Sequence, residues 1–232
     1  MKKTFSIIIL LLFVNITLKA QERYIIINGG ITKPVADFAT NDFGNPDAGY
    51  ATNGYNIGFE IAHFFNPWFG IGGSFKFNNS GFNNQKFNEY LDWNYGSKLD
   101  TIYISSGEYN LHNFLAGPYA KIDLGSRISF FGKTFIGVLS TFRPDQRLDY
   151  RNFGDLENTT TYLEGKLTGA FAWNFGAGML VKLSDSFGIT ATADYIGATP
   201  KFDSFDYETF EPFKDEQTVR YVNLNIGIAL TM

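Results

Sequence analysis

Residues able to move a proton near neutral pH are scarce in this chain. His63 and His112 are its two histidines, and the sequence contains no cysteine. An imidazole titrates close to neutrality, so each histidine is a candidate proton shuttle. Two histidines far apart in the sequence, without cysteine, do not make a convincing zinc site. The missing cysteine also excludes disulfides, thiolate nucleophiles and an N-terminal lipid anchor.

His112 carries the one catalytic hypothesis that the sequence offers. Acyl transfer by a triad needs a nucleophile, a base and an orienting acid within hydrogen-bonding reach. Ser105 and Ser106 precede His112 by a few residues, but no local signature places a serine beside its ring. An enzyme that acts on lipid at the rim of a β-barrel therefore stays an alternative, and no catalytic residue is assigned. His63, which precedes two phenylalanines, is expected at an interface near a turn.

Glu60 and Lys76 are the most interesting charged residues. They are expected on the inward faces of two strands joined by a tight turn at 66–67, near each other across that hairpin. A charge facing lipid costs about 2–4 kcal/mol at mid-depth, so both should point into a polar interior. The interior neighbours we expect are Asn56, Asn174, Asp194 and Asn225. Two hypotheses remain open, namely a structural polar plug and a gated ion path that Glu60→Gln would alter.

The segment 79–107 is the main candidate for surface recognition. It mixes asparagines with aromatic rings, among which we single out Phe87, Tyr90, Trp93 and Tyr95. Rings and amides together suit carbohydrate or protein surfaces, and the alternative is a loop that packs on itself. Residues 101–105 alternate again and are followed by Ser-Gly-Glu-Tyr at 106–109, which predicts a hairpin that extends a barrel beyond the membrane. The acidic segment after residue 200 lacks the spacing of an EF-hand and is expected to be solvated.

The elements that must position these residues are β-strands. Eight segments carry alternating apolar residues and internal glycines: roughly 23–33, 54–65, 68–78, 108–122, 128–142, 168–183, 187–199 and 218–231. A period of two indicates strands with two different faces, because a helix would need a period near 3.6. The fourth and fifth segments alternate less cleanly, and they leave open which face Lys121 and Phe131 take.

The connections between these segments alternate in length. Short ones lie at 66–67, 123–127 and 184–186; long polar ones lie at about 34–53, 79–107, 143–167 and 200–217. This asymmetry is typical of a transmembrane β-barrel, with short periplasmic turns and long outer loops. The backbone must be satisfied within the protein at membrane depth, so the sheet must close. The sequence predicts an eight-stranded antiparallel up-and-down transmembrane β-barrel whose lumen is filled by side chains.

Aromatic residues fall into two groups that match the two ends of these strands. Beside the short turns lie Phe64, Phe65, Trp68, Phe69, Phe130 and Phe187. Toward the long loops lie Tyr55, Phe77, Tyr109, Phe142, Phe171, Tyr195 and Tyr221. Amphipathic rings favour the headgroup layer, so the two groups predict interfacial girdles. Core packing in a soluble β protein is the alternative explanation for the same rings.

The first twenty residues have the pattern of a secretory signal peptide. Lys2 and Lys3 precede an apolar run at 7–14, and Ala20 precedes the expected cleavage point. We expect residues 1–20 to be the signal peptide and 21–232 to be the outer-membrane barrel domain. Loss of three lysines changes the formal charge from −4 to −7, which disfavours nucleic acid as a partner. No nucleotide-binding fingerprint is present, so no cofactor is expected.

The mature chain resembles the small outer-membrane β-barrel proteins grouped as PorT-like or outer membrane protein beta-barrel domain proteins. Its last residues resemble the C-terminal insertion signal of such barrels, with Asn225, Gly227, Leu230 and Met232 in the polar, glycine and two hydrophobic places. This ending departs from the aromatic terminus of many members. The resemblance implies a Gram-negative outer-membrane location, a lipid environment and recognition by the barrel-insertion machinery.

The function that we expect is that of a non-enzymatic outer-membrane barrel with a structural or surface-interaction role. Its long outer loops would meet a surface protein or glycan. A secreted lipocalin-like barrel with an apolar interior and a bound apolar ligand is one alternative, since alternation alone does not say which face is inside. The rim enzyme at His112 is the other.

Overall fold

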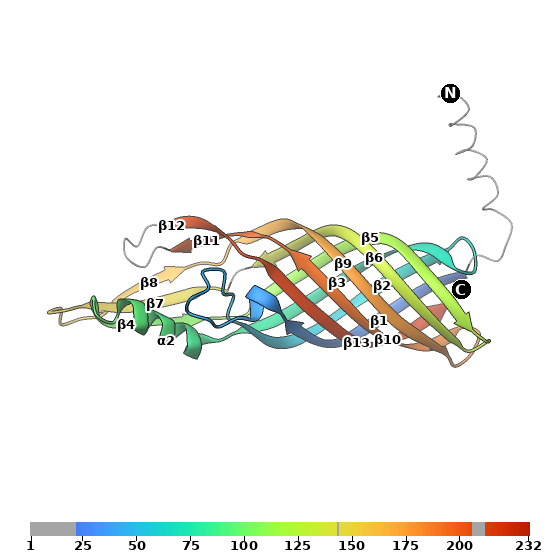
Figure 1. Cartoon of the computed structure of the whole chain (residues 1–232), viewed down its shortest axis with the longest axis horizontal. Coiled ribbons are helices and arrows are strands. Elements are labelled where there is room, and N and C mark those ends of the chain that lie inside the picture. The colour runs from blue at the N-terminus through green and yellow to red at the C-terminus, as the bar shows by residue number, and fades with distance from the viewer. Residues whose placement is uncertain (1–21, 143, 206–211) are drawn as a thin grey trace, which may run out of the picture.

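The protein is a closed antiparallel barrel. The computed structural model describes residues 22–142, 144–205 and 212–232. Eight long strands close in the order β1-β13-β10-β9-β6-β5-β3-β2 (Figure 1). They are β1 (Glu22–Pro34), β2 (Ala51–Phe64), β3 (Phe69–Phe82), β5 (Tyr109–Leu124), β6 (Ile128–Phe142), β9 (Leu167–Lys182), β10 (Phe187–Ala198) and β13 (Val219–Thr231). The predicted fold and all eight predicted strands are confirmed, whereas the proposed signal peptide lies outside the described residues.

The barrel closes between its first and last strands. β13 pairs antiparallel with β1 from Tyr221 to Thr231, with Asn28 opposite Gly227 and Ile31 opposite Leu224. The eight strands are 12 to 16 residues long, which exceeds the nine to eleven that a tilted transmembrane strand needs. No helix among the described residues is long and apolar enough to cross a membrane.

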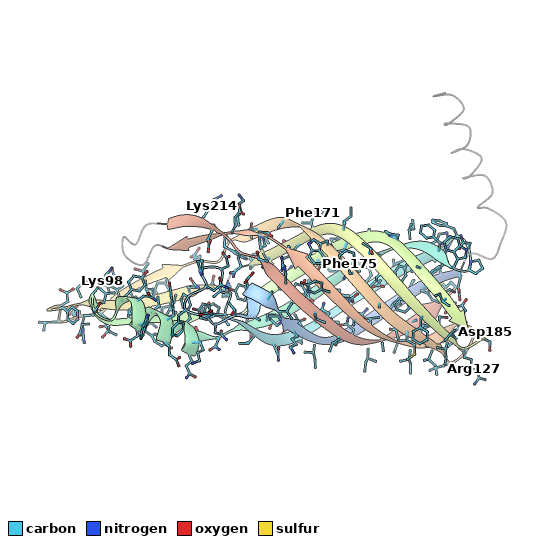
Figure 2. The ribbon with its side chains drawn as sticks, in the orientation of Figure 1. Lys98, Arg127, Phe171, Phe175, Asp185 and Lys214 are labelled. Carbon is cyan, nitrogen blue, oxygen red and sulfur yellow. The ribbon has the colours of Figure 1, made fainter. Side chains whose placement is uncertain are left out.

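The outer wall of the barrel is apolar and its interior is polar in the middle. Ile27, Ile57 and Leu224 are each more than half exposed on the outer wall, and Phe171 and Phe175 project from the same surface (Figure 2). Polar and charged residues of the same strands are buried inside. The outward direction of the apolar residues contradicts the lipocalin-like alternative, which needs apolar residues inside the barrel. Lys121 and Phe131, whose faces the sequence left open, both point inward.

The predicted aromatic girdles are correct only in part. Outward-facing rings include Trp68, Phe69, Phe130 and Phe187 near the short turns, and Tyr55, Phe77, Phe142 and Phe171 near the long loops. Phe64, Tyr109 and Tyr221 instead lie inside the barrel and are almost wholly buried. Their strand positions have inward parity, so they close the two ends of the core rather than meet the headgroups.

A second layer of structure extends the barrel at its long-loop end, which we call the outer end. It contains the 3-10 helix η1 (Ala36–Ala39), α2 (Asn84–Tyr95), a sheet β4-β7-β8 and a hairpin β11-β12 (Figure 1). These strands are β4 (Leu99–Ser106), β7 (Gln146–Asn152), β8 (Thr159–Leu163), β11 (Lys201–Phe205) and β12 (Pro212–Glu216). A separate buried cluster holds α2 against this sheet, formed by Tyr50, Phe87, Leu91, Leu99, Ile102, Ile104 and Leu148.

The hairpin that the sequence predicts at residues 101–109 is wrong. β4 pairs with β7, with Ile104 opposite Leu148, and it continues past 107–108 into β5. β7 likewise continues β6, and β8 runs on into β9, so the outer sheet prolongs the barrel wall. The pairing joins segments more than forty residues apart, which local alternation does not reveal.

Candidate functional site

The centre of the barrel holds four charged side chains in contact. The ammonium of Lys133 on β6 lies 2.5 Å from a Glu60 oxygen and 2.9 Å from an Asp194 oxygen. Lys76 on β3 lies 2.6 Å from the other Asp194 oxygen. All four side chains are buried and their formal charges cancel. Complete pairing of this kind is what keeps buried charge tolerable in a low-dielectric interior.

Glu60 and Lys76 are both inside, and Lys76 pairs with Asp194, one of the expected neighbours, whereas Glu60 pairs with Lys133 and not with Lys76. The β2-β3 register places Ser74 opposite Glu60 and Gly58 opposite Lys76. No direct ion pair between Glu60 and Lys76 forms in the described structure; Lys133 contacts both Glu60 and Asp194, and Lys76 contacts Asp194. Lys133 was missed since adjacent phenylalanines at 130 and 131 obscure the alternation of that strand.

Aromatic and amide side chains complete the interior on both sides of this ionic cluster. The hydroxyl of Tyr119 donates to Glu60, and the amide of Asn225 donates to Asp194 at 3.3 Å. Toward the outer end, Asn223 donates to Asn78 at 2.7 Å. An inner cavity near the short-turn end measures only about 10 Å³, at the limit of what holds a single water molecule. Of the two hypotheses, this arrangement favours the structural polar plug.

The two histidines lie on the outside of the barrel. The ring centroid of His112 is 4.9 Å from that of Phe77 and 6.3 Å from that of Phe142, so it sits within the outer aromatic girdle. Within the described residues, neither Ser105 nor Ser106 donates its hydroxyl to His112. His63 accepts a hydrogen bond from Arg23 at 3.3 Å near the short turns, as the sequence predicts for an interfacial residue.

The four aromatic residues singled out at 79–107 have different environments. Phe87 is buried, and Tyr90 and Tyr95 are half-buried against the buried cluster that holds α2 on the β4-β7-β8 sheet. Trp93 alone is open to solvent, with 79% of its surface exposed. The segment thus packs largely on itself. Tyr50 belongs to the same buried cluster, and its burial raises the pKa of its hydroxyl to about 12.

Helix α2 was missed by sequence reasoning, and so was its contact with β4. The side-chain amide of Asn84 accepts from the backbone N–H of Ser106 at 2.6 Å and donates to its carbonyl at 2.8 Å. Asn88 does the same with Ile104, at the same two distances. Two amides one helical turn apart therefore occupy the places of a neighbouring strand. The four-residue asparagine spacing was visible in the sequence, but its partner was not.

The outer end also exposes large apolar side chains beyond the aromatic segment. Leu156 at the β7-β8 turn is 96% exposed, and Phe153 and Tyr162 are more than half exposed. Tyr103 projects from β4 in the same way. Leu156, Phe153 and Tyr162 fall in a stretch without clear alternation, and Tyr103 falls in an alternating stretch whose pairing partner is distant in the sequence.

The four residues of the C-terminal pattern lie at the barrel closure. Asn225 and Gly227 face inward, Leu230 lies near the end of β13, and the exposed Met232 follows the strand. A β-carbon at Gly227 would come within 2.6 Å of the carbonyl of Ile27 on β1, so this position needs glycine for packing as well.

Comparisons with known proteins bear directly on this architecture. The model of the family described as outer membrane protein beta-barrel domain matches residues 8–230. The chain belongs to this family. It is accordingly an outer-membrane protein, and the expected family resemblance and location are confirmed at this level. No curated protein matches the sequence.

Several solved outer-membrane proteins are similar to this member of the family. Ail of Yersinia pestis is 17% identical with a TM-score of 0.46, covering 92% of this chain and 100% of its own. The neisserial surface protein A is 9% identical with a TM-score of 0.47, covering 91% and 99%. OprG from Pseudomonas aeruginosa is 14% identical with a TM-score of 0.47, covering 90% and 95%.

Proposed function

We propose that this barrel is a non-enzymatic surface-interaction protein that acts through its outer end. The observation that carries this proposal is an outer layer with its own buried core that presents exposed apolar groups to water. The side chains of Leu156, Trp93 and Tyr162 are mostly exposed, so they contribute little to the buried core. Exposed apolar groups gathered beyond the membrane are typical of interaction sites.

The packed interior supports the same proposal. Ion pairs and amide contacts fill the middle of the lumen, so side chains rather than a water column occupy the axis. An eight-stranded barrel has an interior of just this capacity. The function that remains for such a barrel is to hold the outer layer at the cell surface. Lipid would surround the apolar wall, and the insertion machinery would read the C-terminal strand.

The test compares the whole protein with a variant of its outer tip. Labelled protein in lipid nanodiscs is applied to arrays of glycans and of extracellular proteins. We expect binding to some array members, and a loss of at least tenfold in Phe153→Ser/Leu156→Ser. Arg127→Ser at the opposite end serves as the matched surface control. Equal binding by all three proteins, or none above that of empty nanodiscs, would contradict the proposal.

The export steps belong to the same proposal. We infer that residues 1–20 direct export and are removed, and that Asn225, Gly227, Leu230 and Met232 are recognised during insertion. Mass spectrometry of the outer-membrane protein should find an N-terminus at Gln21. Deletion of Met232 should lower the amount of folded barrel in the membrane, judged by the heat-dependent shift in gel mobility.

A further inference from the structure

The two edges of the outer sheet β4-β7-β8 are treated differently. On the β4 edge, the asparagine amides of α2 bond to the N–H and C=O of Ile104 and Ser106. Those backbone groups would otherwise be free to pair with another chain. Proteins commonly cover a sheet edge in this way to prevent such pairing.

The β8 edge has no such cover within the described residues. β8 pairs with β7 on one side and with no other strand. Along the chain, β8 leads into β9 and β10 leads into β11. β9 and β10 pair with each other in the barrel, but β8 and β11 belong to separate sheets. The hydrogen-bonded wall therefore opens between β8 and the β11-β12 hairpin (Figure 1).

The residues of β8 favour strand pairing. Residues 159–162 read Thr-Thr-Thr-Tyr, without proline or charge, and Tyr162 is exposed. β-Branched and aromatic residues have high strand propensity. Exposed edges are usually blunted by lysine, proline or bulges, and this edge has none of these. An edge that is built for pairing and left open indicates a docking site.

A second copy in the same membrane does not fit this edge. Two copies side by side are related by rotation about the membrane normal, so their β8 strands run toward the membrane in the same direction. An antiparallel ladder needs opposite directions, and a parallel ladder needs unlike edges to meet. The rotation makes the β8 edges of the two copies face each other while both β8 strands run in the same direction. Neither an antiparallel nor a parallel ladder can form in that arrangement. The occupant must therefore come from outside the membrane.

Charge at the outer end indicates the chemistry of that occupant. By sequence, the four segments that join the spanning strands there, residues 35–50, 83–108, 143–166 and 199–218, carry 18 acidic and eight basic residues. Five acidic residues remain in the rest of the chain. A field of this sign attracts cationic partners and repels anionic ones such as sulfated glycans.

We propose that the free edge of β8 receives an extended, basic segment of another polypeptide by β-strand addition. The proposal rests on the surface-interaction function and names its partner class. Main-chain hydrogen bonds to β8 would supply the affinity, and alternate side chains would supply the specificity.

The probe is a set of twelve-residue peptides selected from a random library on the whole protein in nanodiscs. We expect the selected peptides to be basic and to bind at least tenfold more weakly when salt rises from 50 to 500 mM. N-methylation of alternate peptide residues distinguishes the docking mode, because only every second N–H faces the strand that is joined. One alternating set should lose binding at least tenfold, and the other should retain it.

Hydrogen exchange locates the peptide on the protein. Amides of β8 should gain protection when the peptide binds, and those of Ile104 and Ser106 should not change. Asn84→Ala/Asn88→Ala, which opens the β4 edge, should leave the affinity at β8 unaltered. Equal effects of both N-methylated sets, protection away from β8, or no selected peptide would overturn strand addition. Binding on the arrays would still test the surface-interaction function separately, through the tip variant.

Discussion

At the scale of single residues, Lys133 determines whether the interior charges are tolerated. It is the contact shared by Glu60 and Asp194, and all three side chains are buried. Lys133→Ala would leave Glu60 without its cation and should destabilise the barrel by about 3–5 kcal/mol. Urea unfolding in lipid vesicles, followed by tryptophan fluorescence, measures this loss.

Two controls separate burial from charge at this position. Lys201→Ala removes a surface ion pair with Glu216, in which both side chains are mostly exposed, and should cost less than about 1 kcal/mol. Glu60→Gln/Lys133→Met removes both members of the buried pair and leaves Lys76 with Asp194. It should recover most of the loss caused by Lys133→Ala. Equal costs for Lys133→Ala and Lys201→Ala would show that the ion pairs do not stabilise the interior.

The same residues provide a test of the ion-path hypothesis. With the charges paired and the axis packed, we expect no steady conductance from the wild-type protein in planar bilayers. Glu60→Gln retains the shape of the side chain and the hydrogen bond from Tyr119, so it should not open a path. Long-lived unitary currents that change in this variant would support an ion path and oppose the packed plug.

At the scale of elements, the asparagine amides of α2 should protect the edge of β4. Asn88→Ala should leave the N–H of Ile104 without its side-chain acceptor, and that amide should exchange at least tenfold faster. Asn94→Ala is the matched control, because Asn94 bonds to the Tyr90 carbonyl of its own helix and faces solvent. If both variants exchange alike at Ile104, the amides of α2 do not protect the β4 edge.

The β7-β8 hairpin should respond to acid through Asp149. The Thr160 hydroxyl and the Arg147 guanidinium both donate to this carboxylate and lower its pKa below the ordinary 3.8. A carboxyl group with a lowered pKa stabilises the fold above its ordinary pKa, and this contribution is lost as pH falls through the folded value. The protection of β8 amides, measured relative to the intrinsic exchange rate at each pH, should therefore fall below about pH 4.

Substitution shows whether Asp149 causes that response. Asp149→Asn should lower the protection of β8 amides at neutral pH and remove most of the dependence of that protection on acid. Asp155→Asn, at the hairpin turn, retains the contacts of Asp149 and should follow the wild type. An unchanged acid response in Asp149→Asn would assign the effect to other groups.

The barrel strands could be predicted from the sequence because each has one apolar face that points out of the barrel. Alternation along β2 and β13 is nearly perfect, since every outward position must be apolar at membrane depth. The strand that contains Lys133 alternates less cleanly because both of its faces carry rings. The observed register was therefore needed to show that Lys133 faces inward and joins the ionic cluster.

The outer layer could not be predicted for a different reason. Residues 84–95 include three asparagines and several aromatic residues, which are weak helix formers. They form α2 because Phe87 and Leu91 dock on a sheet whose strands are distant in sequence. Sequence alone shows the aromatic residues of this layer but not the pairing of β4 with β7 that buries them.

At the scale of the whole molecule, depth in the membrane should decide the cost of a charge on the outer wall. Leu224 lies midway along β13, opposite Ala193 and Ile31, and is about half exposed. Leu224→Arg should cost about 2–4 kcal/mol in lipid vesicles, because the charge would lie near the middle of the hydrocarbon layer. Leu156→Arg, on the fully exposed outer hairpin, should cost about 0.5 kcal/mol or less. A soluble barrel would tolerate both changes equally, since each residue would then meet water. The difference between the two urea midpoints thus measures directly which surface of this barrel the lipid covers.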